Sequence, residues 1–260
     1  MSKLIKKIIH SLLFGKLFQI EPFFGLITAS FIANPKIFSV SYKGNEMKYD
    51  VSSGEVRNFI HFFWESKVEI ETRMLLEKHL RDGDVFLNVG AHIGTYVIFA
   101  NTIRDLKRTI CVEPASPNIG NMLKNIRLNG IENADVLHCA AADKNEFDEF
   151  TYENFEPGYY NGRLLNVVPH EKQRLPKIGS EFLRIAVLDD VIRDLNFDRP
   201  NCLLMDIDHH ELVALKGMVE ILNDPNFRFA IIETRKQTDE AVVAPISQMN
   251  SLIDALRWRL

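Results

Sequence analysis

From residue 85 onward the chain alternates short apolar runs with segments of helical periodicity, and this alternation constrains the fold more than any other feature. The runs are too short and too rich in Val, Ile and Leu to be anything but buried strands. Strands that alternate with helices at this pace are typical of βαβ units, so we predict an α/β fold with a doubly wound, mostly parallel sheet. The expected strands and helices are, in chain order, 85–89, 95–103, 109–112, 117–128, 134–140, 187–195, 202–207, 211–222, 227–233 and 247–256.

Composition sets the class of protein. Hydrophobic residues make up 46% of the 260 positions and charged residues 25%, which are ordinary globular values and exclude wholesale disorder and a multi-span membrane protein. The net charge of −4 argues against a nucleic-acid partner. Cys111, Cys139 and Cys202 lie in apolar runs without metal-binding spacing, which predicts buried, reduced thiols in a cytoplasmic protein.

Residues 1–65 are expected to form an N-terminal extension, and residues 66–260 a single α/β domain. Residues 1–20 contain four lysines, no acid and apolar residues at helical spacing. This basic amphipathic pattern is typical of a helix that packs on the domain or on a partner subunit of a homo-oligomer, or of one that makes peripheral membrane contact. A hairpin is predicted over 40–51.

A helix follows the extension over 69–80, with Met74 on its expected inner side. Residues 144–180 interrupt the regular alternation with a polar, Pro- and Gly-rich insert, which we interpret as an acceptor lid or, alternatively, as a well-packed hairpin. The chain stops shortly after the last predicted helix, so a C-terminal strand pair is expected to be missing.

The turn between the first strand of this alternation and the first helix contains two glycines, Gly90 and Gly94. Glycine lets the backbone turn tightly and approach a ligand closely, and a helix N-terminus presents N–H groups to it. The alternative is a tight turn with a purely structural role. Glu113 ends the second strand, where an acidic side chain can hold the two hydroxyls of a ribose.

The chain resembles the FkbM-type S-adenosylmethionine-dependent methyltransferases over residues 69–233. The resemblance is carried by 83–94 (GDVFLNVGAHIG), 112–114 (VEP), 125–130 (NIRLNG) and the late segment 206–217 (DIDHHELVALKG). It implies a class I methyltransferase, Rossmann-like fold and transfer of a methyl group from S-adenosyl-L-methionine to a hydroxyl of a carbohydrate or related small molecule. The residues expected to hold the cofactor are Asn88, Gly90, Ala91, His92, Gly94, Glu113, Ala142, Asp143 and Glu69.

The chain departs from the family pattern at five places. The family usually has Asp at 88, Asn at 92, Lys at 204, Glu at 208 and Gly at 209, whereas this chain has Asn88, His92, Leu204, Asp208 and His209. These departures motivate an alternative in which the chain is a catalytically impaired cofactor-binding or scaffolding module.

Methyl transfer to a hydroxyl needs alignment of the reacting atoms and a base for the hydroxyl proton. We place this base at His209, oriented by Asp206 or Asp208, because histidine titrates near neutral pH. The acidic residues Asp208 and Glu211 could instead cap the helix that follows and stabilise its N-terminus. A further alternative is a metal-dependent enzyme that uses the cluster from Asp206 to Glu211, although the resemblance itself implies no metal.

Overall fold

The core of the protein is an open parallel sheet of six strands. The computed structural model describes residues 36–159, 162–164, 178–207, 210–235 and 255–259. The strand order is β5-β4-β3-β10-β11-β12, and all five pairings are parallel. The chain winds outward from β3 in one direction and then from β10 in the other, which confirms the predicted doubly wound, Rossmann-like fold. The strands are β3 (Val85–Val89), β4 (Arg108–Glu113), β5 (Ala134–His138), β10 (Cys202–Met205), β11 (Phe229–Arg235) and β12 (Ala255–Arg259).

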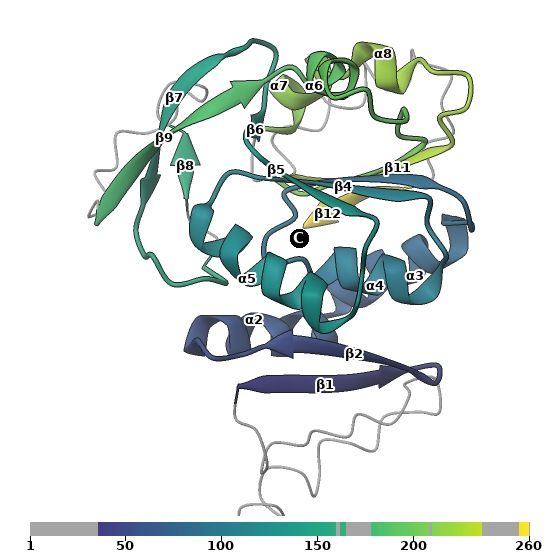
Figure 1. Cartoon of the computed structure of the whole chain (residues 1–260), viewed down its shortest axis with the longest axis vertical. Helices are drawn as coiled ribbons and strands as arrows, with labels where there is room; N and C mark the ends of the chain where they lie inside the picture. Colours follow the sequence, from purple (N-terminus) through teal and green to yellow (C-terminus); the bar gives the residue numbers. More distant parts are fainter. Residues whose placement is uncertain (1–35, 160–161, 165–177, 208–209, 236–254, 260) are drawn as a thin grey trace, which may run out of the picture.

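Helices cover both faces of this sheet (Figure 1). All five residues of β3 are buried, as expected for a strand covered on both sides. Phe86 packs on one face with Phe99, and Leu87 packs on the other with Leu203. The helices of the first face are α3 (Lys67–His79), α4 (Thr95–Ile103) and α5 (Ser116–Leu128), and those of the second are α6 (Leu188–Asp194), α7 (Glu211–Lys216) and α8 (Val219–Leu222).

The segment before the sheet forms the predicted hairpin and then a helix, α2 (Gly54–Glu65). Strands β1 (Ile37–Tyr42) and β2 (Asn45–Asp50) are joined by Lys43 and Gly44, which have φ angles of 50° and 87°. Two residues with positive φ match the twist of a tight hairpin turn. The hairpin, α2 and α4 share one hydrophobic core, so the described part of the extension packs directly onto the α/β layer. The predicted helix over 1–20 lies outside the described residues.

The insert over 144–180 contributes to a small second sheet. Its strand order is β6-β9-β7-β8, where β6 (Ala140–Ala141) continues from the main sheet. The other strands are β7 (Glu146–Tyr152), β8 (Arg163–Leu164) and β9 (Gly179–Ala186). Phe150 and Leu183 are buried between this sheet and the main domain. The described part of the insert therefore contains regular strands, joined by an irregular segment over 153–159.

Two details of the predicted helices are wrong. The expected helix over 211–222 is divided into α7 and α8 at Gly217 and Met218. Gly217 lies against the backbone of Ala142, whose carbonyl oxygen a Cβ there would overlap. The expected helix over 247–256 lies outside the described residues except for Ala255 and Leu256, which belong to strand β12. This strand pairs with β11, so the sheet edge that was expected to lack its terminal strands holds one.

The inner face of α3 also differs from the prediction. Met74 is 60% exposed, whereas Arg73 is 2% exposed. The guanidinium of Arg73 donates to the carbonyl oxygens of Phe63 and Trp64 and lies over both aromatic rings. A cation is favoured there because the C-terminus of α2 carries partial negative charge.

The three cysteines are buried and free, as predicted. Within the part of the chain that the structure describes, none of the helices has both the length and the apolar character needed to cross a bilayer.

Candidate active site

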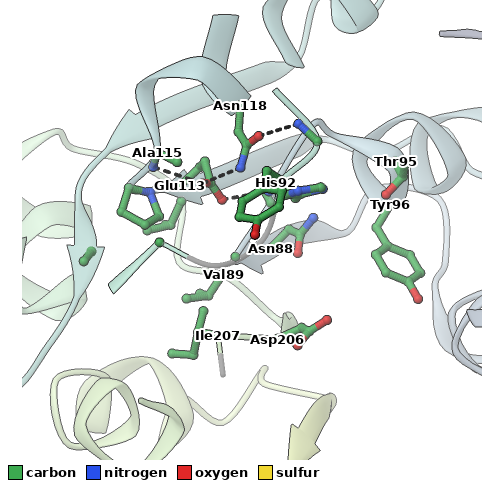
Figure 2. Close-up of a pocket in the computed structure, with 18 of the residues that line it drawn as sticks. Asn88, Val89, His92, Thr95, Tyr96, Glu113, Ala115, Asn118, Asp206 and Ile207 are labelled. Carbon is green, nitrogen blue, oxygen red and sulfur yellow. Dashed lines mark hydrogen bonds between the residues drawn. The ribbon is translucent and has the colours of Figure 1, made fainter. Parts of the chain in front are cut away.

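A cavity of about 480 Å³ lies at the carboxyl ends of β3, β4 and β10. Ligands of open α/β sheets bind where the strand order reverses, which here is the gap between β3 and β10. Residues from α2, from the β3–α4 loop and from the insert complete the wall. Figure 2 shows His92 of the β3–α4 loop beside Glu113. The predicted site residues among its lining are Asn88, Gly90, Ala91, His92, Glu113, Glu69 and Asp206.

Gly90 brings the β3–α4 loop against the end of β10. Its φ is +81°, and a Cβ would overlap the backbone of Asp206 and lie 2.9 Å from Cγ2 of Ile207. The N–H groups of Gly90 and Ala91 both donate to the carbonyl oxygen of Val112, at 2.9 and 3.0 Å. These two N–H groups are therefore engaged by β4.

Gly94 has a structural role at the start of α4. It also has a φ of +81°, at the N-cap of α4, and a Cβ would lie 2.8 Å from Cγ of Met122. Its small size lets α4 begin close to α5. Gly94 does not line the cavity, but Thr95, the next residue, does.

Glu113 is held by three hydrogen bonds. Its carboxylate accepts from the backbone N–H groups of His92 at 2.8 Å and Ala115 at 3.0 Å, and from the amide of Asn118 at 3.3 Å (Figure 2). Burial raises the pKa of the carboxyl, and these hydrogen bonds oppose the shift. A carboxylate offers about four acceptor positions, so at least one remains for a ligand hydroxyl.

Asn88 and Asp206 lie together at the end of the sheet. Asn88 is 1% exposed, and its Nδ2 has no hydrogen-bond partner among the described residues. Asp206 follows β10, and its N–H donates to the carbonyl oxygen of Val89 at 3.0 Å. A buried amide without an acceptor is unfavourable, so a ligand atom that accepts a hydrogen bond would satisfy Asn88.

His92 is a neutral aromatic wall. Burial lowers its pKa to about 4, and the backbone of Tyr159 and Gly158 opposes part of this shift. The imidazole lies 4.2 Å from the ring of Phe59, measured between centroids. Its φ of 51° is unusual for a residue with a side chain.

Glu69 is 4% exposed and lines the cavity, so it is not an exposed residue on the surface of α3. The hydroxyl of Tyr96 donates to its carboxylate. Burial raises the pKa of Tyr96 well above its usual value, and the charge of Glu69 adds to the shift. Tyr96 therefore stays protonated and keeps Glu69 in place.

The segment after β5 lines the cavity with Cys139, Ala140 and Ala141. Ala142 and Asp143, which were predicted to hold the cofactor, do not line it. Ala142 is fully buried behind the wall, where its N–H donates to the carbonyl oxygen of Ala186. Asp143 is exposed to solvent and does not line the cavity.

The late cluster is described only in part, since Asp208 and His209 lie outside the described residues. Asp206 and His210 line the cavity, and Nδ1 of His210 is 3.3 Å from the carbonyl oxygen of Ile207. Glu211 is buried at the start of α7 and does not line it. Among the described residues, no group of three His, Cys, Asp or Glu side chains is placed to hold a metal ion.

The outer wall includes residues of the insert and of α2. Tyr159, which the sequence suggests as a sugar-contacting residue of an acceptor lid together with Tyr160 and Asn161, lines the cavity, whereas Tyr160 and Asn161 lie outside the described residues. The missed signal is on α2, whose cavity residues recur at positions i, i+3, i+4 and i+7. These residues are Glu55, Asn58, Phe59 and Phe62.

Comparison with known proteins gave solved structures only, since no protein-family model and no curated protein matches the chain. A methyltransferase FkbM from Methylobacillus flagellatus KT is 19% identical over 66% of this chain and 38% of that chain, with a TM-score of 0.46. A precorrin-6y C5,15-methyltransferase from Geobacter metallireducens GS-15 is 12% identical over 71% of this chain and 73% of that one, with a TM-score of 0.43. An rRNA methylase from Streptococcus thermophilus is 12% identical over 61% and 65%, with a TM-score of 0.37. The chain therefore spans 38% of the length of the FkbM structure.

Proposed function

We propose that this protein binds S-adenosyl-L-methionine and transfers its methyl group to a hydroxyl of a carbohydrate or related small molecule. The observation that carries the proposal is the charge of the cavity. Its wall contains four carboxylates and, among the described lining residues, no lysine or arginine. The cofactor has a sulfonium, an ammonium and one carboxylate, so its net charge is positive and complements this wall. The four acids are Glu55, Glu69, Glu113 and Asp206.

The residues at the strand ends fit the two polar ends of this cofactor. Glu113, already positioned by its three hydrogen bonds, has acceptor capacity left for a ribose hydroxyl. The unpaired amide of Asn88 suits the carboxylate of the amino-acid end, and Asp206 beside it suits the ammonium. Cys139 to Ala141 form a wall of small side chains on which a planar adenine can lie.

The cofactor, when bound, supplies an electrophilic methyl group. The protein must then exclude water, align the acceptor and take up the hydroxyl proton. We place the base at His209, oriented by Asp206 or Asp208. The neighbouring residue His210 supports this placement because it lines the cavity.

The acceptor is proposed to be small rather than a nucleic acid, because the net charge of −4 and the acidic cavity both disfavour a polyanion. A cytoplasmic location is proposed on the basis of the three buried, reduced cysteines.

Isothermal titration calorimetry with S-adenosylmethionine tests the cofactor step. Glu113→Gln keeps the side chain's size and removes its charge, so we expect binding to weaken by about tenfold or more. Glu132→Gln, at an exposed glutamate, is the matched control and should bind normally. The absence of binding by the wild-type protein would refute the proposal.

Two further outcomes concern the reaction. Binding without transfer to any acceptor in a panel of glycosides and other alcohols would favour the impaired module. A transfer activity abolished by a chelator and restored by a divalent ion would favour the metal-dependent alternative.

A further inference from the structure

We propose that α2 is the acceptor platform of this site, on which the ring of a sugar stacks against Phe62 and Phe59 while Asn58 and Glu55 bond its hydroxyls. This inference rests on the proposed function and extends it from the cofactor to the acceptor. It assigns the recognition of the acceptor to the segment that precedes the methyltransferase-like core.

The helix α2 has two functional faces. Val56, Ile60 and Phe63 are almost fully buried and belong to the core shared with the hairpin. The residues at 55, 58, 59 and 62 lie on another face, one helical turn apart from each other, and line the cavity. On this second face Phe59 packs partly against the core, whereas Glu55, Asn58 and Phe62 lie beside the cavity without belonging to the core.

The insert fixes α2 at the mouth of the cavity. A Cβ at Gly158 would lie 2.7 Å from the backbone nitrogen of Val56, so the two backbones are in close contact. The N–H of Gly158 donates to Asn118 at 2.9 Å, and the hydroxyl of Ser53 donates to Glu156 at 2.8 Å. Since Asn118 also donates to Glu113, one short network joins the platform to the proposed ribose site.

The side chains on this face suit a carbohydrate in particular. A pyranose ring has an apolar face of C–H groups and an edge of hydroxyls, so it needs an aromatic surface with hydrogen-bonding groups beside it. Phe62 is 47% exposed and lines the cavity, so its ring is accessible to a ligand bound there. Its ring lies 6.4 Å from that of Phe59, which in turn packs on His92.

Two polar residues of α2, Asn58 and Glu55, can form hydrogen bonds with the hydroxyls of the sugar. The amide of Asn58 both donates and accepts hydrogen bonds, and the carboxylate of Glu55 accepts them. Hydroxyls of a sugar ring need both kinds of partner. A flat aromatic acceptor would use the phenylalanine rings but would leave these two polar side chains without a role.

Saturation-transfer difference NMR tests the platform, with the methyl glycosides of glucose, galactose, mannose and rhamnose as probes and S-adenosylhomocysteine present. We expect transfer to the ring protons of at least one glycoside, and binding weakened about tenfold in Phe62→Ala. Asn58→Ala should weaken binding as well. Phe147→Ala is the matched control, because Phe147 is 75% exposed on the small sheet and does not line the cavity; its glycoside binding should be unchanged.

Calorimetry with S-adenosylhomocysteine on the same variants separates the two proposals. If this cofactor product binds normally but no glycoside binds, or if catechol binds in place of the glycosides, the carbohydrate assignment is wrong. Equal glycoside binding by the wild type and Phe62→Ala would show that α2 is not the platform. If the product itself does not bind to the wild type, the proposed function fails and this inference fails with it.

Discussion

Replacing Gly90 with alanine adds one methyl group at the point where the β3–α4 loop meets the end of β10. The residue has a φ of +81°, in the left-handed region that disfavours side chains. The added Cβ would overlap the carbonyl oxygen of Asp206 and lie 2.9 Å from Cγ2 of Ile207. Both groups belong to the segment after β10, so the chain can relieve the overlap only by separating β3 from β10.

The two effects can be given magnitudes. A left-handed conformation costs a residue with a side chain about 1–2 kcal/mol. Inserting a methyl group into a packed region costs about 1–3 kcal/mol more. We therefore expect Gly90→Ala to lower the free energy of unfolding by about 2–5 kcal/mol.

Other glycines of the chain separate these two contributions. Gly83 has the same φ of +81° but nothing within 4 Å of its added Cβ, so Gly83→Ala should cost about 1–2 kcal/mol from the backbone alone. At Gly94 the added Cβ would meet the flexible side chain of Met122 at 2.8 Å, which predicts an intermediate loss. Gly120 lies in α5 with open space around it, so Gly120→Ala should stabilise the protein by about 0.5–1 kcal/mol.

The free energy of unfolding of the four variants can be measured by urea denaturation monitored by circular dichroism. The slope of the free energy with urea should stay constant, so that midpoints report stability. Calorimetry with S-adenosylmethionine should also show a larger loss for Gly90→Ala than for Gly83→Ala. If Gly90→Ala and Gly83→Ala agree within about 0.5 kcal/mol, the close approach of β3 and β10 does not restrict this position and the reasoning is refuted.

Two further substitutions test the buried side chains of Arg73 and His92. Arg73→Met removes a cation that donates to the carbonyl oxygens at the end of α2, and we expect a loss of about 3 kcal/mol in urea unfolding, against almost none for the exposed Arg127→Met. The pKa of His92 is about 4 in the folded protein and 6.5 in the unfolded chain, so the unfolded chain binds more protons between these values. Stability should therefore fall by about 3 kcal/mol as the pH drops from above 6.5 to 4. This dependence should be missing in His92→Asn, because asparagine tolerates the φ of 51° and does not titrate.

Local sequence signals predicted the elements of the sheet well. Strand β3 and helix α4 have the predicted bounds, because an apolar run ends at glycine and a new helical period begins directly after it. The sequence also predicted the hairpin around Lys43 and Gly44, and it placed Glu113 at the end of β4. Both features depend on residues that are neighbours in the sequence.

Features that depend on distant contacts were not predictable in this way. Arg73 is buried because two aromatic rings of another helix receive it, and nothing in the periodicity of α3 distinguishes it from the exposed Met74. The close packing of Gly217, where the late helix is divided, involves the carbonyl of Ala142, which is 75 positions away. The cavity face of α2 was missed because its aromatic residues resemble a core stripe until the true core face is known.

The structure also connects two departures from the FkbM-type pattern. Asn88 and Leu204 occupy the positions where that pattern has Asp and Lys. They are register partners on the neighbouring strands β3 and β10, so their side chains lie on the same face of the sheet, and they are 1% and 2% exposed. An Asp and a Lys there would form a buried ion pair, which this chain replaces with a neutral pair. We therefore expect the two departures to be one compensated change, in which case they would not by themselves imply an impaired site.

A double-mutant cycle tests this coupling. Asn88→Asp and Leu204→Lys each bury one unpaired charge, so each alone should lower the free energy of unfolding by about 3 kcal/mol. In the double variant the charges neutralise each other, and the loss should be smaller than the sum of the single losses by about 2 kcal/mol or more. Urea unfolding at pH 7 measures all four corners of the cycle. If the losses add within about 0.5 kcal/mol, the two positions are independent, and each departure has to be explained separately.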